Sequence, residues 1–268
     1  MADYREFLRI LENQHSGRAV GFEYRWDKSL AEQLVWRRGD TLWKTEQDRV
    51  QTLMTAALRC GLDCVALELE EAEGKIPILP HLGKMLPSGM KAAVGMTKGL
   101  WESRGNLPAF LQLYRRLAEE PAVCAVIVRD RGEAFSGSIA EYRQSMREIS
   151  GEIHRTGKPC IWADCGEQPI PLEWIAGCGF DAVHLTAFFP QDTADIWREY
   201  HSEFALLGDT RMDWVLRQKP RDIIAYCEFI QNLTENCGYA FGMGNPSGKP
   251  ISYLTYVSVL TALARGQR

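Results

Sequence analysis

Acidic, basic and nucleophilic side chains recur in this sequence where short apolar runs end. In "KPCIWADCGEQ", residues 158 to 168, the apolar run Cys160–Trp162 leads into Asp164 and Cys165. The ends of other runs carry Glu23 and Arg25, Glu68, Arg129 and Asp130, His184, Asp209, and Asn245. Carboxylates and guanidiniums gathered in one place suit a polar or anionic substrate, because arginine forks to carboxylate groups.

Individual roles follow from side-chain chemistry. Asp130 and Asp164 are candidate general bases. Cys165 is a nucleophile or a thiolate metal ligand if nearby cations lower its pKa; the alternative is a small apolar residue in a tight turn. His184, inside "DAVHLT", is either a site residue at a strand end or a satisfied core histidine. The charged set as a whole has an alternative interpretation as a ring of structural ion pairs.

Eight apolar runs, nearly all separated by segments of helical period, have to position these side chains. The predicted strands cover residues 19–26, 63–70, 91–97, 123–130, 159–164, 181–186, 204–209 and 239–244. Strands that alternate with helices predict a parallel sheet, and eight such units predict a closed (β/α)8 barrel, or TIM barrel. The C-terminal ends of the strands in that fold gather the reactive groups on one face.

The chain is expected to be a single α/β domain over residues 1–268, with an N-terminal helix at 3–13 ahead of the first strand. An open doubly wound sheet is the competing fold, but it usually has a glycine-rich turn after its first strand. "GFEYRWDKSL" has no such turn. Residues 71–90 predict a long loop over the active face or an irregular connection.

Bulk composition excludes several classes of function. The 268 residues carry a net charge of −4, which gives no indication of nucleic-acid binding. No apolar run approaches the roughly 20 residues that span a membrane. The eight cysteines are scattered through apolar segments without a CxxC pair, so the sequence predicts neither a disulfide framework nor a zinc ribbon, and favours a reducing cytoplasm.

Four segments in order resemble a known family: "EYRQSMREISGEIHRTGKPCIWADCGE", "LEWIAGCGFDAVH", "FALLGDTRMDWVL" and "GYAFGMGNPSG". They are similar to the uroporphyrinogen decarboxylase superfamily, and closest in kind to its cobalamin-dependent methyltransferase branch. The resemblance is clearest over residues 125–268. It implies a barrel, a small methylated substrate, and a corrinoid (cobalamin) cofactor carried by a partner protein that binds corrinoid.

The sequence departs from the family's zinc pattern. Zinc-dependent methyltransferases of the superfamily end the fifth strand in His-x-Cys-Gly and carry a second cysteine after the eighth. The matching positions here are Ala163, Cys165 and Met243, so two of three ligands differ. Zinc needs three protein ligands and an open position. Cys165 with Asp164 and His184 is one set that would restore them.

Three functions remain open. In the first, a methyltransferase, an acid such as Asp130, Asp164 or Glu68, or a metal, polarises the heteroatom that loses the methyl group. Glu23, Arg25, Arg129, Asp209 and Asn245 then bind the substrate. The second is a decarboxylase that clamps carboxylates with Arg25 and Arg129. The third is a non-catalytic barrel that binds a small molecule or a partner protein.

Overall fold

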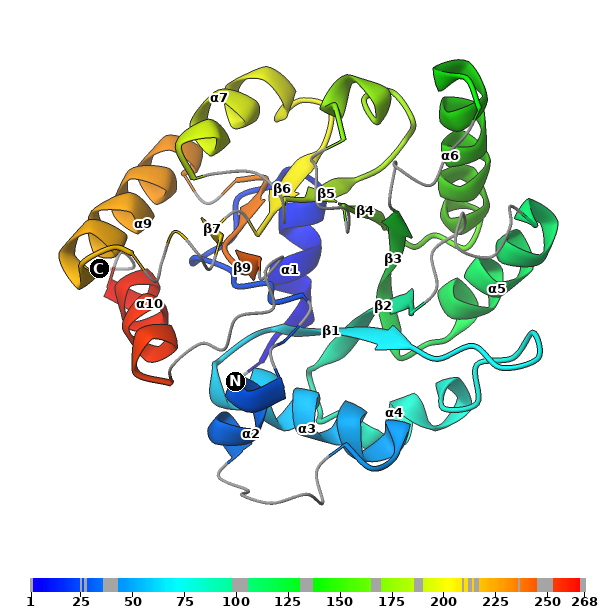
Figure 1. Ribbon diagram of the computed structural model, residues 1–268, viewed down its shortest axis with the longest axis horizontal. Coiled ribbons are helices and arrows are strands. Elements are labelled where there is room, and N and C mark those ends of the chain that lie inside the picture. The colour runs from blue at the N-terminus through cyan, green and yellow to red at the C-terminus, as the bar shows by residue number, and fades with distance from the viewer. Residues whose placement is uncertain are drawn as a thin grey trace.

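The computed structural model of the chain describes residues 2–24, 26, 28–35, 43–97, 106–130, 137–164, 170–185, 190–208, 210–211, 214, 217–235, 237–244 and 253–265. Within these residues, a curled sheet of seven parallel strands forms the centre, and helices cover its outer face (Figure 1). The fold is α/β and resembles a TIM barrel.

Sheet neighbours follow the order of the chain. The strands are β1 (Cys64–Leu69), β2 (Lys91–Met96), β3 (Val123–Asp130), β4 (Cys160–Asp164), β5 (Ala182–His184), β6 (Ala205–Leu207) and β8 (Tyr239–Ala240), each parallel to the next. A separate two-stranded pair joins β7 (Thr210–Arg211) to β9 (Met243–Gly244). Parallel neighbours in this order place all the C-terminal strand ends on one side.

The bounds of the described helices are α1 (Tyr4–Leu11), α2 (Lys28–Val35), α3 (Glu46–Arg59), α4 (Leu82–Met85), α5 (Leu107–Glu119), α6 (Ile139–His154), α7 (Pro190–Tyr200), α9 (Pro220–Thr234) and α10 (Tyr253–Arg265), with 3-10 turns at Leu79–His81 and Leu172–Trp174. Helices α1, α2 and α3 precede β1 along the chain, α10 follows β9, and the other described helices lie between strands. Capping boxes start two of the helices: Thr45 with Asp48 at α3, and Ser138 with Glu141 at α6. Such caps satisfy backbone N–H groups that have no partner within the helix.

The predicted first and eighth strands differ most from the structure. Among the described residues of 19–26, one parallel bridge joins Gly21 to Phe241, supported by hydrogen bonds from Phe22 N to Phe241 O (2.7 Å) and from Phe241 N to Val20 O (2.9 Å). The predicted strand 239–244 divides into β8 and β9. Within the described residues, the main sheet therefore has seven strands in place of eight. The predicted first strand is a segment that pairs with the sheet through a single bridge.

The two faces of the sheet have different side chains. Toward the inside, each of the seven strands contributes one alanine, and Ile127, Ile161 and Leu207 lie among them; the alanines are Ala66, Ala93, Ala125, Ala163, Ala182, Ala205 and Ala240. Toward the helices, the alternating positions carry larger residues such as Leu67, Val94, Val128 and Trp162. Barrel interiors are usually filled by branched side chains. The small inner residues here leave room for the rings of Phe22, Tyr24 and His184.

Helix α1 lies across the N-terminal end of the strands, as Figure 1 shows at the centre of the ring. Hydrogen bonds fix both of its ends: Asp3 N donates to Asp63 Oδ1 (2.9 Å), and the thiol of Cys237 donates to Asn13 O (3.0 Å). Its apolar face packs into the inner core, where Phe7 stacks on Phe22 with 4.9 Å between ring centroids. This packing covers the N-terminal end of the strands.

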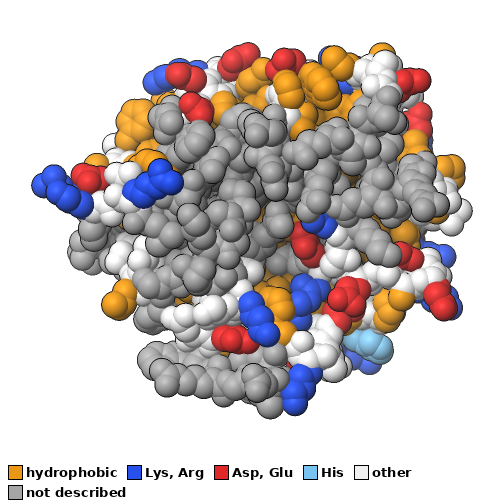
Figure 2. All heavy atoms as spheres, in the orientation of Figure 1, with side chains coloured by type: hydrophobic (Ala, Val, Ile, Leu, Met, Phe, Trp, Pro, Cys, Tyr) orange, Lys and Arg blue, Asp and Glu red, His pale blue; other side chains and the backbone are white. Residues whose placement is uncertain are grey.

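The segment 71–90 is an irregular connection. After a turn it forms the 3-10 turn at Leu79 and helix α4, and Ile76, Ile78 and Leu82 are buried in the outer core. None of the helices in the described ranges has the length and apolar character that crossing a membrane requires. Figure 2 shows basic and acidic side chains interspersed over the described part of one face.

Candidate functional site

A polar cluster lies inside the curled sheet at its C-terminal end. It contains Tyr24 from the segment beside β8, Glu68 from β1, Arg129 from β3 and His184 from β5. The Tyr24 hydroxyl donates to Glu68 Oε1 over 2.7 Å, and Arg129 Nε lies 3.7 Å from the same oxygen. The ring of Tyr24 meets the ring of His184 edge to face, with 5.2 Å between centroids. Tyr24 thus joins an acid from one strand to a histidine from another.

The backbone around the cluster holds it in place. Arg129 also donates to the carbonyl oxygen of Thr97, and Arg49 of α3 donates to the carbonyl oxygen of Glu68. His184 is fully buried, and a Cβ atom added to Gly208 would come within 2.7 Å of its Nε2. Glycine at position 208 therefore lets the chain after β6 approach the imidazole closely.

The register separates the predicted catalytic residues into two groups. Ala163 pairs with Arg129 on one side and with His184 on the other, so these three positions share the inner face. Asp130 pairs with Asp164 one residue later, and successive strand residues point to opposite faces. The prediction that the side chains of Asp130, Asp164 and His184 point into one shared site is therefore wrong for the two aspartates.

Asp130 and Asp164 contact the helix layer and nearby backbone. Asp130 Oδ2 accepts a hydrogen bond from the hydroxyl of Tyr142 in α6, and both residues are buried. Burial and the neighbouring Asp130 raise the pKa of Tyr142, so the phenol is a proton donor across the physiological range. Asp164 Oδ2 accepts from the backbone N–H of Ile170 (3.1 Å). These contacts anchor α6 and the chain after β4.

Glu23 also lies on the outer side. Its neighbours Phe22 and Tyr24 belong to the inner core, and alternation turns Glu23 toward α10. There the hydroxyl of Tyr256 donates to Glu23 Oε2 over 3.2 Å, in a buried contact. Burial, then Glu23, raises the pKa of Tyr256 well above its usual value. Glu23 thus lies between the sheet and α10, away from the polar cluster, in contrast to its predicted role.

Four predicted site residues lie outside the described residues: Arg25, Cys165, Asp209 and Asn245. Their roles stay predictions. The sequence interpretation missed Tyr24, although the alternation in "GFEYRW" was the signal: it sets Phe22 and Tyr24 on one face and Glu23 on the other.

The proposed zinc ligand set does not fit the geometry. Asp164 and His184 occupy opposite faces of the sheet, so one ion cannot bind both side chains. Across the described residues, no three histidine, cysteine or acidic side chains gather closely enough to hold a metal. The role of Cys165, outside the described residues, stays a prediction. The seven cysteines that the structure describes are all free thiols.

The seven-stranded curled sheet places this chain among proteins of TIM-barrel-like fold. Comparison of the sequence with protein-family models and with curated proteins finds no match. Among solved structures, the chain is similar to a methyltransferase from Methanosarcina mazei, with a TM-score of 0.68 and 12% identity over 98% of this chain and 97% of that one.

Other enzymes share the fold at lower scores. D-psicose 3-epimerase from Clostridium cellulolyticum H10 has a TM-score of 0.55 and 9% identity, over 85% of this chain and 95% of that one. The endo-1,4-β-mannanase from Rhizomucor miehei has a TM-score of 0.55 and 10% identity, over 83% and 91%. At these identities the likeness concerns the fold alone, which supports many chemistries.

Proposed function

We propose that this protein is a methyltransferase that moves a methyl group between a small methylated substrate and a corrinoid carried by a partner protein. The observation that carries the proposal is the Tyr24–Glu68 hydrogen bond at the C-terminal end of the sheet, beside Arg129 and His184. Similarity over nearly the full length to a methyltransferase supports the reaction class. The order of motifs over residues 125–268 supports a place in the uroporphyrinogen decarboxylase superfamily.

The cluster supplies what a methyl donor needs from the protein. When a methyl group leaves an oxygen, nitrogen or sulfur atom, that atom keeps the electron pair and is stabilised by a proton. Glu68 accepts the Tyr24 hydrogen, so the pair can hold and move a proton between the two oxygens. The Arg129 guanidinium forms an ion pair with Glu68. It also donates a hydrogen bond to the carbonyl oxygen of Thr97, which holds it in place. His184 and Phe22 close the apolar floor below.

The corrinoid would supply the acceptor for the methyl group, and the partner protein would hold it. The chain's own geometry fits an approach from the C-terminal end of the strands, because α1 fills the other end. No step in this proposal depends on zinc.

Decarboxylation is the less favoured reaction. A carboxylate clamp needs a guanidinium that is free to fork onto the substrate. Arg129 instead contacts Glu68 and the Thr97 carbonyl, so a substrate carboxylate has to compete with both. A non-catalytic barrel is less favoured too, because an acid, a phenol and a guanidinium contact one another at the C-terminal end of the sheet.

Substitution of the cluster tests the methyltransferase proposal. The purified protein is incubated with free cob(I)alamin and a panel of methyl ethers, methylamines and methyl thioethers, and loss of cob(I)alamin absorbance is followed. We expect Glu68→Gln to lower the rate about 10²- to 10⁴-fold, the usual contribution of a general acid or base. Tyr24→Phe leaves Glu68 in place but removes its hydrogen-bond partner and the second oxygen of the proton-sharing pair, so a loss of at least roughly tenfold is expected.

The control is Glu73→Gln, which removes an exposed carboxylate from the turn after β1. Its rate should equal that of the wild type. If no substrate in the panel methylates cob(I)alamin or a corrinoid protein, the proposal fails. Release of carbon dioxide from a polycarboxylate would then favour the decarboxylase.

A further inference from the structure

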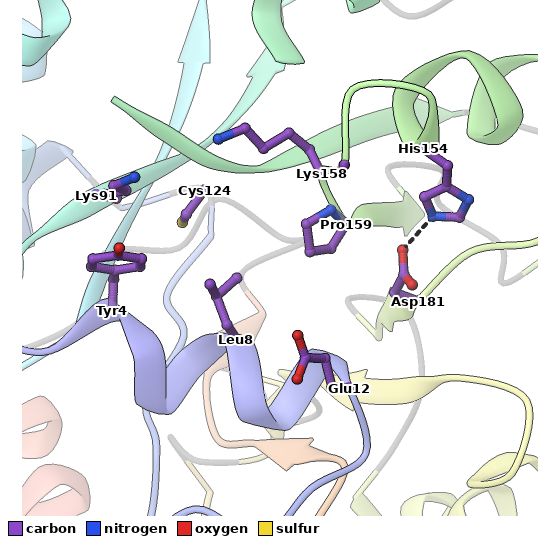
Figure 3. A pocket seen from close by; sticks show the side chains of 10 residues that line it. Tyr4, Leu8, Glu12, Lys91, Cys124, His154, Lys158, Pro159 and Asp181 are labelled. Carbon is purple, nitrogen blue, oxygen red and sulfur yellow. Dashed lines mark hydrogen bonds and ion pairs between the residues drawn. The ribbon is translucent and has the colours of Figure 1, made fainter. Parts of the chain in front are cut away.

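A pocket lies at the opposite end of the strands from the polar cluster, under α1 (Figure 3). Its volume is about 520 Å³, and its lining comes from the start of β2, β3 and β4 together with α1 and the end of α6. The residues that matter here are Tyr4, Leu8, Lys91, Lys158 and Pro159. The pocket is separate from the polar cluster and has no role in the proposed methyl transfer.

Two half-buried lysines dominate the charge of this pocket. Lys158 extends across it toward the side on which Lys91 and Cys124 lie, as Figure 3 shows. The pKa of Lys158 is lowered, first by burial and then by the positive charge of Lys91. Because the charge of Lys91 disfavours the charged form of Lys158, an anion placed between the two side chains is stabilised.

Neither lysine has an ion-pair partner in the described part of the chain, and the charge of Glu120 is the smallest of the effects on the pKa of Lys158. Lys158 Nζ donates one hydrogen bond, to Val123 O (2.8 Å), and Lys91 Nζ lies 4.7 Å from the centre of the Tyr4 ring. No ion pair to either ammonium is formed by a described carboxylate. An ammonium has three donors, so both lysines keep hydrogens for a ligand.

The acidic groups of the pocket leave this positive end available. Asp181 is engaged by His154 Nε2 (2.7 Å), and it also accepts from the backbone N–H of Cys160 (2.7 Å). Glu12 is exposed and lines the pocket from the same face of α1 as Leu8, and Figure 3 shows it toward the Asp181 end, away from Lys91. Between the charged ends, Leu8, Pro159 and the ring of Tyr4 offer an apolar wall.

We propose that this pocket binds a small organic oxyanion, a phosphate monoester or a carboxylate, with its charged head between Lys91 and Lys158 and its apolar part against Leu8 and Pro159. Lysine recognises phosphate and carboxylate as a point charge, without the planar fork of arginine. A pocket of this volume holds a molecule of one ring or a short chain.

Binding of three one-ring probes to the full-length protein tests the site. Phenyl phosphate and benzoate distinguish the two kinds of oxyanion, and benzamide is the neutral match to benzoate. Calorimetric titration at low salt should give saturable binding of one or both anions and none of benzamide. Raising the salt to 0.5 M should weaken the binding, since partly exposed charges are screened.

Substitution of the lysines identifies the place of binding. Lys91→Met and Lys158→Met keep the length of the side chain and remove its charge, and each should weaken anion binding at least tenfold. Lys84→Met, on the exposed side of α4, should bind the anions as the wild type does. Thermal melting of each variant confirms that it is folded.

Several outcomes would overturn the proposal: no saturable binding of either anion, benzamide binding as tightly as benzoate, or equal anion binding by the wild type and a folded Lys91→Met/Lys158→Met variant. None of these measurements depends on methyl transfer, so the proposed function stands or fails separately.

Discussion

Tyr24 shows how one side chain can connect residues that are far apart in the sequence. It reaches Glu68, 44 positions away, through its hydroxyl and His184 through its ring. The hydrogen bond orients the carboxylate, and the ring contact fills the space above the alanine-lined interior. A tyrosine suits this position because it has an apolar body and a polar tip.

Tyr142 and Asp130 form the corresponding contact on the outer side of the sheet, and here we predict a structural role. Tyr142→Phe removes one hydrogen bond to a buried carboxylate, and a hydrogen bond to a charged group contributes about 1.5–3 kcal/mol. Urea unfolding should show that loss of stability, while the methyl-transfer rate stays within about twofold. Tyr200→Phe, in the partly exposed end of α7, is the control and should change neither.

A large loss of activity in Tyr142→Phe without a loss of stability would contradict this view. Asp130 would then regain the catalytic role that the sequence predicts for it.

His154 and Asp181 make stability depend on pH. The hydrogen bond with Asp181 raises the pKa of His154, and burial opposes it less strongly. A histidine whose folded-state pKa exceeds its unfolded value of about 6.5 stabilises the fold fully below that value, and the contribution disappears as the pH rises through the folded pKa.

We therefore expect His154→Gln to destabilise the protein more at pH 5.5 than at pH 8.5. Chemical unfolding of both proteins at the two values measures the difference. His81→Gln, an exposed histidine in the 3-10 turn before α4, should show no such dependence. A His154→Gln effect that is the same at both pH values would show that the interaction with Asp181 does not depend on charge.

At the level of elements, the segment that carries Tyr24 depends on a close backbone approach. It pairs with the chain after β8 through two hydrogen bonds. Side-chain contacts join it to β1 and to the residue just before that strand, including the Arg18–Asp63 ion pair. A Cβ atom added to Gly242 would collide with the carbonyl oxygen of Phe22. Glycine at 242 thus allows the first segment to lie against the sheet.

Gly242→Ala should push this segment outward. We expect a loss of stability of about 1–3 kcal/mol, the usual range for overpacking, and a fall in activity because Tyr24 moves away from Glu68. Thermal melting and the methyl-transfer assay measure the two effects. Gly151→Ala is the matched control: it lies within α6 with open space around it, so it should be neutral or slightly stabilising. Equal melting of the wild type and Gly242→Ala would contradict this account.

At the scale of the whole molecule, the two ends of the curled sheet have different properties. The C-terminal end carries the acid–phenol pair, while the N-terminal end is covered by α1 and holds the two-lysine pocket. Parallel strands produce this asymmetry, because every strand starts at one end and finishes at the other. The proposed reaction and the proposed oxyanion site therefore occupy opposite ends.

The sequence by itself determined the parallel α/β architecture. Apolar runs such as "VCAVIVRD" and "PCIWAD" identify β3 and β4 almost to the residue, because fully buried strands are continuously apolar and differ sharply from the capped helices between them. The N-terminal helix was predicted as well. Local pattern was sufficient for these elements.

Only the tertiary structure decided which side chains share a face. Glu23, Asp130 and Asp164 sit at strand ends beside inward-facing residues, yet a shift of one position turns each of them toward a helix. A continuously apolar strand carries no alternation in its sequence that marks its inner face. Local sequence also does not predict the weak pairing of residues 19–26, because that pairing depends on Gly242, more than 200 residues away, and on the placement of α1.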